Sequence, residues 1–249
     1  MKSNEELQRH ASELLARAKT SGISSLRLLG GVAIRRLYPE PSIHPGLDRV
    51  CKDLDFAVAR KDAKRLSEVF RDCGFEADRH FNALHGETRM MFASGELQAD
   101  VFVGEFSQCH KLSLEPRLHA VKETLSPADL LLMKLQVVEI NEKDLQDLCI
   151  ILLGAEVGVV DASAVINLSY ITRLTSQDWG WFTTCTDTVT KLRKYAAEKL
   201  AGAQQKTVQN KLDEMEQAIL DHSKSMKWKI RNAVGRKVLW YQLPEEARR

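Results

Sequence analysis

The chain has 249 residues, of which 44% are hydrophobic and 28% charged, with a formal net charge of +2, as expected for a globular protein of one large or two modest domains. Its five scattered cysteines include no CxxC pair, which favours neither a zinc site nor a disulfide framework. No apolar stretch is long enough to span a bilayer and the N-terminus lacks the apolar segment of a signal peptide, so we expect a cytoplasmic protein without a membrane partner.

The charge is unevenly distributed along the chain. Residues 188–249 hold fourteen Lys and Arg against seven Asp and Glu, so the preceding part is net acidic. This asymmetry is typical of a basic module that serves a more acidic catalytic one. We therefore expect two domains, a catalytic one over residues 1–158 and a helical, basic one over residues 159–249.

The N-terminal third shows alternating helix and strand signals. Ser3-x-x-Glu6 is a capping-box pattern that predicts an N-terminal helix. Residues 25–29 are typical of a buried strand that ends in Gly30-Gly31, and residues 32–37 of a short helix. The prolines that follow predict a loop over residues 39–50.

The next segments predict two more strands around a hairpin. Residues 53–58 alternate strictly, so Asp53 and Asp55 share one face of a strand. Residues 61–73 are expected to form one amphipathic helix, and residues 88–93 and 97–103 a hairpin. Asp100 lies out of phase with the apolar residues of the second hairpin strand.

From Ser126 onward the pattern is helical. Ser126 and Pro127 supply an N-cap and a first-turn proline. The predicted helices cover residues 127–140, 142–153, 161–173, 177–202, 205–222 and 226–240. The expected fold is an α/β (α+β) domain with a mixed sheet and flanking helices, followed by a helical domain.

The aspartates predict a magnesium site. Side chains two positions apart on a strand lie roughly 6–7 Å apart at their bases, so Asp53 and Asp55 can reach one hard cation. Asp100, on a neighbouring strand, could act as a third ligand or take a proton from an attacking hydroxyl. Gly30 and Gly31 would let the backbone and the next helix approach a phosphate closely.

These residues carry a family resemblance. Leu29-Gly30-Gly31-Val32-Ala33 with Asp53-Leu54-Asp55-Phe56 resembles the signature of the polymerase-β-like nucleotidyltransferase superfamily. The run from Arg49 to Phe56 is similar to a segment of the AbiEii-like nucleotidyltransferases, which include toxin components of toxin–antitoxin systems. The runs 127–135 and 143–148 are similar to two later motifs of that group. Cys51 stands where the group has Ser or Thr, and the long spacing between the glycines and Asp53 indicates an insertion at 39–50.

The resemblance implies further site residues. It places Arg49, Gly30 and Gly31 at the nucleotide and brings Lys134 to the triphosphate, with Asp144 close by. From the residues alone, Lys134 is a charge within an apolar helix, which should face a cleft or a partner charge. Asp147 could do no more than hold the two helices together.

The C-terminal segment suggests contact with nucleic acid. Between His222 and Trp240 there are six Lys and Arg and no acid, interrupted by Trp228 and Trp240. This pattern suits a phosphate backbone with unstacked bases and points to Lys227, Trp228, Lys229 and Arg231 as RNA-binding residues. The alternative is a solvated amphipathic helix whose apolar residues face inward, namely Met226, Ile230, Val234 and Leu239.

The leading hypothesis is a Mg²⁺-dependent nucleotidyltransferase that moves NMP from an NTP to an acceptor hydroxyl. The acceptor could be RNA such as tRNA, a small hydroxylated molecule such as an antibiotic, or a protein side chain. An antitoxin protein is a further expected partner if the chain is a toxin component. The alternative is a non-catalytic nucleic-acid-binding or antitoxin-associated protein on a degenerate version of this fold.

Overall fold

The computed structural model describes residues 3–39 and 45–243, which divide by their packing into two compact units. The first unit consists of the described residues within 1–41, 49–106 and 112–125, and the second of those within 42–48, 107–111 and 126–249. Residues 126–158, assigned above to the catalytic domain, pack with the second unit. Within the described residues, no helix is long and apolar enough to cross a membrane.

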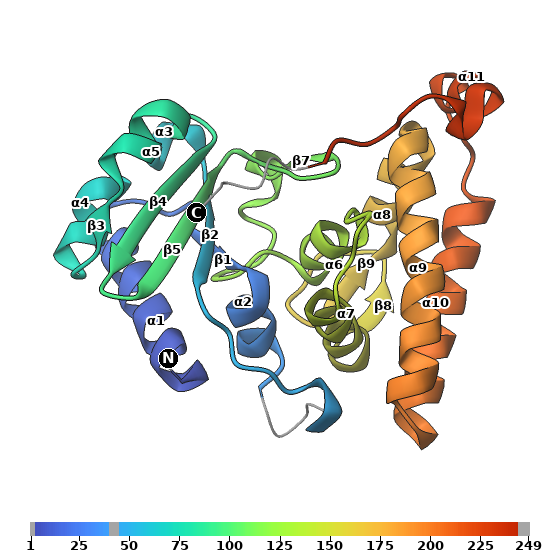
Figure 1. Ribbon diagram of the computed structural model, residues 1–249, viewed down its shortest axis with the longest axis horizontal. Coiled ribbons are helices and arrows are strands. Elements are labelled where there is room, and N and C mark those ends of the chain that lie inside the picture. The colour runs from blue at the N-terminus through green and yellow to red at the C-terminus, as the bar shows by residue number, and fades with distance from the viewer. Residues whose placement is uncertain (1–2, 40–44, 244–249) are drawn as a thin grey trace. The chain divides into compact units, whose positions relative to one another are not determined.

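The first unit is built on a five-stranded mixed sheet with helices (Figure 1). The strand order is β1-β2-β5-β4-β3, in which β2 and β5 are parallel and the other pairs antiparallel. The strands are β1 (Arg27–Leu29), β2 (Leu54–Val58), β3 (Glu76–Ala77), β4 (Arg89–Ser94) and β5 (Leu97–Val103). The helices are α1 (Asn4–Thr20), α2 (Gly30–Leu37), α3 (Arg60–Ala63), α4 (Leu66–Asp72), α5 (Arg79–His85) and the 3-10 turn η3 (Glu115–Arg117). The expected mixed α/β character is confirmed.

Several local predictions hold in this unit. Ser3 caps α1, and the reciprocal bonds with Glu6 complete the capping box. The predicted helix over residues 61–73 is wrong in one respect, because it is broken into α3 and α4. The buried carboxylate of Asp62 in α3 accepts a hydrogen bond of 2.6 Å from Ser25 Oγ. This bond holds α3 against the residues that precede β1, which favours a break before α4.

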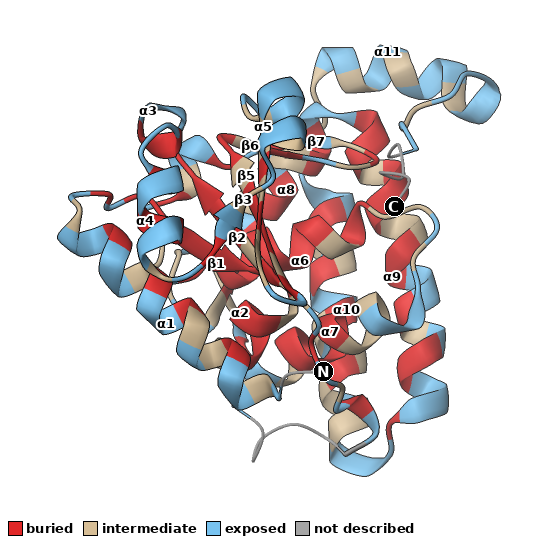
Figure 2. Cartoon of the chain, turned by 60° about the vertical axis from the view of Figure 1, so that its left-hand side comes forward, coloured by how far each residue is buried: buried red, intermediate tan, exposed pale blue. Residues whose placement is uncertain are grey.

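The second unit is mainly helical. Its helices are α6 (Pro127–Leu135), α7 (Glu142–Gly154), α8 (Leu168–Gln177), α9 (Trp179–Lys199), α10 (Gly202–Asp221) and α11 (Met226–Val234), with the 3-10 turns η2 (Pro45–Leu47) and η4 (Gly235–Lys237). Figure 2 shows their buried faces in red, most continuous on α6 and on one side of α9. Two short strands between the units along the chain, β6 (Glu105–Ser107) and β7 (Lys111–Ser113), pair with each other.

The sequence analysis missed a two-stranded parallel sheet in this unit. Strand β9 (Val165–Asn167) lies within the helix predicted over residues 161–173, and its partner β8 (Glu156–Gly158) lies between that helix and the one predicted over residues 142–153. Their β-branched residues Val157, Val165 and Ile166 pack well in a pleated strand. The predicted helix 161–173 therefore begins only at Leu168, where the Asn167 side chain caps it by accepting from the Tyr170 amide.

Candidate active site

The carboxylates predicted as the metal site lie on two neighbouring parallel strands. Asp55 of β2 pairs directly with Asp100 of β5, so the two side chains point to the same face of the sheet. Asp53 comes one residue before β2, and both it and Asp55 are partly exposed, whereas Leu54 between them is buried. The sheet register thus brings together the carboxylates that the sequence could place only on separate strands.

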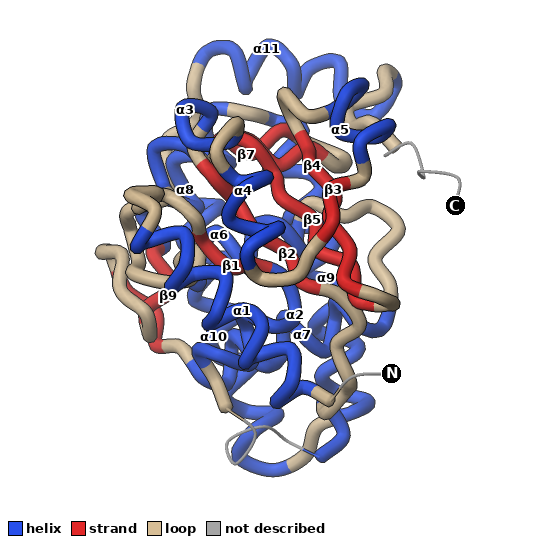
Figure 3. Tube along the Cα trace, turned by 90° about the vertical axis from the view of Figure 1, so that its left-hand side faces the viewer, coloured by secondary structure: helices blue, strands red, loops and turns tan. Residues whose placement is uncertain are grey.

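The opposite face of the sheet carries the packed core of the first unit. Phe56 lies edge-on to Phe70 of α4, with ring centroids 5.8 Å apart, and Phe70 stacks on Phe92 at 4.1 Å. Figure 3 shows α4 lying across the strands. Because successive strand residues point to opposite faces, this helix layer lies on the other side of the sheet from Asp55.

The two glycines lie beside Asp55 because of the register of β1. Leu29, the last residue of β1, pairs with Asp55, so the chain turns into α2 next to that carboxylate. Gly30 has φ of 71°, and a Cβ there would clash with Asp55 Oδ2. A Cβ on Gly31 would lie 2.7 Å from Arg49 Nη2. The positive φ and the contact with Asp55 require glycine at position 30, and the start of α2, Asp55 and Arg49 meet at one place.

A side chain from α1 fixes the segment that precedes β2. Asn4 Nδ2 donates to the Arg49 carbonyl at 3.2 Å, and the Cys51 amide donates to Asn4 Oδ1 at 2.9 Å. The Cys51 side chain is only 3% exposed. The position held by Ser or Thr in the similar family is therefore part of the core in this chain.

Arg89 is a site residue that the sequence analysis missed. Its Nη2 donates to Asp100 Oδ2 at 2.5 Å, and its guanidinium lies 5.3 Å from the Phe102 ring centroid. The other oxygen, Asp100 Oδ1, is buried and has no hydrogen-bond partner among the described residues. The predicted hairpin turn held the signal, because pairing Ser94 with Leu97 places Arg89 diagonally across from Asp100.

The donor set fits a magnesium ion that arrives with its nucleotide. Within residues 3–39 and 45–243, no group of three or more His, Cys, Asp or Glu side chains could hold a metal. Mg²⁺, however, is usually bound through one or two carboxylates together with substrate phosphates and water. Asp55 and the buried, unpartnered Oδ1 of Asp100 suit this mode, because a carboxylate oxygen without a partner is costly to bury.

Lys134 lies in the second unit and is paired with two carboxylates of α7. Its Nζ donates to Asp144 Oδ1 at 2.6 Å and lies 3.2 Å from Asp147 Oδ2. The three side chains are 18%, 15% and 0% exposed, in that order. The partner charge expected for a lysine in an apolar helix is present, whereas its contact with triphosphate stays a prediction.

Helix α11 does not turn inward the apolar residues that the amphipathic-helix alternative placed there. The four apolar residues expected to face inward, Met226, Ile230, Val234 and Leu239, are 71%, 65%, 40% and 70% exposed. Trp228 packs inward instead, with its ring edge-on to Phe182 at a centroid distance of 5.1 Å. Burying an indole removes more apolar surface from water than burying a Met or Val side chain, which favours this orientation.

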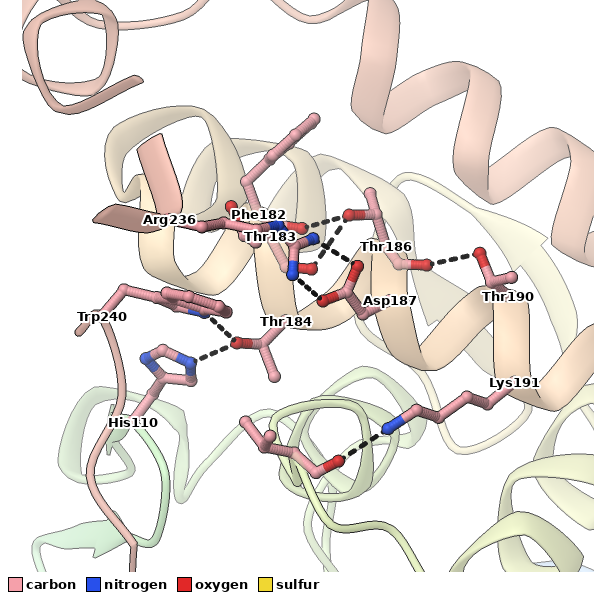
Figure 4. A network of polar contacts seen from close by, with 11 residues as sticks. His110, Phe182, Thr183, Thr184, Thr186, Asp187, Thr190, Lys191, Arg236 and Trp240 are labelled. Atoms are coloured by element: carbon pink, nitrogen blue, oxygen red, sulfur yellow. Dashed lines mark hydrogen bonds and ion pairs between the residues drawn. The ribbon is translucent and has the colours of Figure 1, made fainter. Parts of the chain in front are cut away.

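Half of the basic residues of this segment are occupied by contacts within the chain. Lys224 Nζ donates to backbone carbonyls, including that of His222 at 2.7 Å, and Arg231 donates to the Gly235 and Val238 carbonyls at 2.6 and 2.7 Å. Arg236 binds both oxygens of an aspartate of α9 (Figure 4). The side chains of Lys227, Lys229 and Lys237 are exposed. Arg231 is therefore a structural residue, and Lys227 and Lys229 are the predicted RNA contacts that solvent can reach.

No family model matches this chain. A search of curated proteins gives no match either. The similarity to nucleotidyltransferases therefore rests on the residues quoted above and on their arrangement in the first unit.

Proposed function

We propose that the chain is a magnesium-dependent nucleotidyltransferase, which moves NMP from an NTP to an acceptor hydroxyl and releases pyrophosphate. The observation that carries this proposal is the pairing of Asp55 with Asp100, with the glycine turn at the start of α2 pressed against Asp55. Such a site offers carboxylates to a cation and helix amides to phosphate oxygens within a few ångströms of each other. A nucleoside triphosphate with its magnesium ion would supply both the cation for the carboxylates and the phosphate oxygens for the amides.

The residues can be assigned roles in the transfer. The acceptor oxygen forms a bond to the α-phosphorus, and the bond from that phosphorus to the bridging oxygen breaks, so pyrophosphate leaves with the electron pair. Asp53 and Asp55 would hold Mg²⁺, which neutralises phosphate charge when it is bound. Asp100 is a third ligand or accepts the hydroxyl proton at Oδ1, since Arg89 occupies its other oxygen. Gly30, Gly31 and Arg49 would surround the phosphates.

The second unit would contribute a lysine to the proposed site. By resemblance, Lys134 would contact the triphosphate, with Asp144 positioning it. The acceptor class remains open among RNA, a small hydroxylated molecule and a protein side chain. A toxin role rests on the resemblance alone, and an active-site variant that relieves growth arrest would support it.

The test is incubation of the full chain with each labelled NTP and Mg²⁺, together with total RNA or cell extract. Asp53→Asn and Asp55→Asn should each lower label transfer below about a tenth of the wild-type rate. Their free energies of unfolding should stay within about 1 kcal/mol of wild type, because both carboxylates are partly exposed. Glu68→Gln, an exposed change on α4, is the matched control and should retain full activity.

Two results would contradict the proposal. If either aspartate variant keeps more than about a tenth of the activity, the metal assignment is wrong. If no NTP labels any acceptor while the protein binds RNA, the chain is the non-catalytic nucleic-acid-binding protein on a degenerate fold.

A further inference from the structure

The second unit contains a cavity that the proposed catalytic residues do not use. Its volume is about 610 Å³, within the range of about 300–1,000 Å³ found for small-ligand sites. The chain has four tryptophans, and all of them line this cavity: Trp179, Trp181, Trp228 and Trp240. They come from the start of α9, from α11 and from the segment after η4, so the fold gathers them from separate parts of the sequence.

Hydrogen bonds hold two of the four indoles, Trp179 and Trp240, in fixed orientations. Trp240 Nε1 donates to Thr184 Oγ1 at 3.1 Å, and His110 Nε2 shares the same hydroxyl at 2.8 Å (Figure 4). Trp179 Nε1 donates to Asn232 Oδ1 at 2.7 Å. Rings that are already oriented lose little freedom when a planar ligand stacks on them.

The charges on the cavity wall are mainly positive. Lys111, Lys227 and Arg231 line it together with one acid, Asp178. Asp178 Oδ1 accepts from the Gly180 and Trp181 amides at 2.7 and 3.1 Å, so it serves as the cap of α9. Arg231 is held over the Trp179 ring at 4.5 Å and bonded to carbonyls, whereas Lys227 is exposed and has no ion-pair partner among the described residues. Lys227 is therefore a cation of this wall that is available to a ligand.

We propose that this cavity binds one nucleotide residue, with its base stacked on an indole and its phosphate paired with Lys227. Base–aromatic stacking accepts any base, and the cationic wall selects a ligand that carries an anion. An uncharged aromatic ligand would gain nothing from the lysine, and an organic cation would be repelled by it. As a site for the acceptor this inference rests on the proposed function, whereas binding itself does not depend on transfer.

Intrinsic fluorescence gives a direct test, because every tryptophan of the chain lines the cavity. The full chain is titrated with AMP, GMP, CMP and UMP, and with a short RNA oligonucleotide, in EDTA to remove magnesium-dependent triphosphate binding. Saturable quenching is expected. Lys227→Glu should weaken binding by about tenfold or more, the value of one charge-assisted contact. Lys206→Glu, the same charge change on an exposed α10 residue outside the cavity, should weaken it less than about twofold.

The arms of the experiment separate the outcomes. Tighter binding of the oligonucleotide than of any monophosphate identifies a strand end as the ligand, and equal binding identifies a free nucleotide. No saturable quenching by any probe, or equal losses in the two lysine variants, would overturn the proposal. Asp55→Asn should abolish transfer and leave the quenching unchanged, so a failure of the catalytic proposal is distinguishable from a failure of this one.

Discussion

Replacing Lys134 by Met tests the ion-pair cluster that joins α6 to α7. The change removes the cation but keeps most of the apolar length of the side chain. It leaves Asp144 at 15% and Asp147 at 0% side-chain exposure without the ammonium that lies 2.6 and 3.2 Å away. Asp147 is fully buried and cannot be rehydrated without opening the helix pair.

The size of the effect follows from these distances. At an effective dielectric constant of about 20, the two contacts supply roughly 6 and 5 kcal/mol of attraction, most of which offsets the desolvation of the three charges. Removing one partner of a buried ion pair costs about 3–5 kcal/mol, because the remaining charge stays buried. We therefore expect Lys134→Met to lower the free energy of unfolding of the second unit by about 3–5 kcal/mol.

Tryptophan fluorescence during urea unfolding reports on this unit alone, since all four tryptophans belong to it. Lys143→Met, at an exposed position of α7, is the control and should change stability by less than about 0.5 kcal/mol. In a background with Asp144→Asn and Asp147→Asn, the Lys134→Met change should cost less than about 1.5 kcal/mol, because no buried charge is left unpaired. An equal cost in both backgrounds would refute the ionic explanation.

Three further predictions follow from single positions. In thermal unfolding, Gly30→Ala should destabilise the protein more than Gly74→Ala. Both positions have positive φ, at which a residue with a Cβ loses about 1–2 kcal/mol of stability, but only at Gly30 would the Cβ also clash with a neighbouring side chain. Burial lowers the pKa of His110, so the folded state binds fewer protons than the unfolded state; stability should fall as the pH drops below about 6.5, and His110→Gln should flatten that slope. Arg89→Met should lower kcat for transfer by about tenfold or more with KM for NTP little changed, because Arg89 orients Asp100. Arg89→Lys should restore part of the lost kcat, and an unchanged kcat in Arg89→Met would show that the contact has no role in the reaction.

Sequence patterns that depend on near neighbours in the chain were sufficient to predict several elements of the first unit. The strand predicted from Asp53 to Val58 begins at Leu54, and Ala57 is buried together with the expected apolar face. The capping box at Ser3 and the hairpin around Gly95 appear in the structure as predicted. Each of these is decided by backbone bonds or side-chain directions within a few residues, which is why sequence periodicity reports them. The same holds for Ser126, whose side chain caps α6 by accepting from the Asp129 amide.

Predictions failed where a local pattern competed with packing from elsewhere. The β-branched residues of β8 and β9 follow helical periodicity poorly, but they pair only because Glu156 and Val165 are brought into register. The orientation of α11 depends on which of its apolar side chains finds a packing partner elsewhere. Phe182 of α9 supplies one to Trp228, whereas Ile230 is 65% exposed. Neither outcome is visible in the segment itself.

The sequence by itself determined the first helix and the hairpin strands of the first unit, and the basic, tryptophan-containing character of the C-terminal segment. Tertiary structure alone decided that Asp55 lies beside Asp100 and Gly30, because strand register is a contact between distant parts of the chain. It also decided that Lys134 is paired with two carboxylates, and that four tryptophans line one cavity in which Lys227 is exposed. Charge and residue type are properties of the chain, whereas the distance between two charges or two rings exists only once the chain is packed.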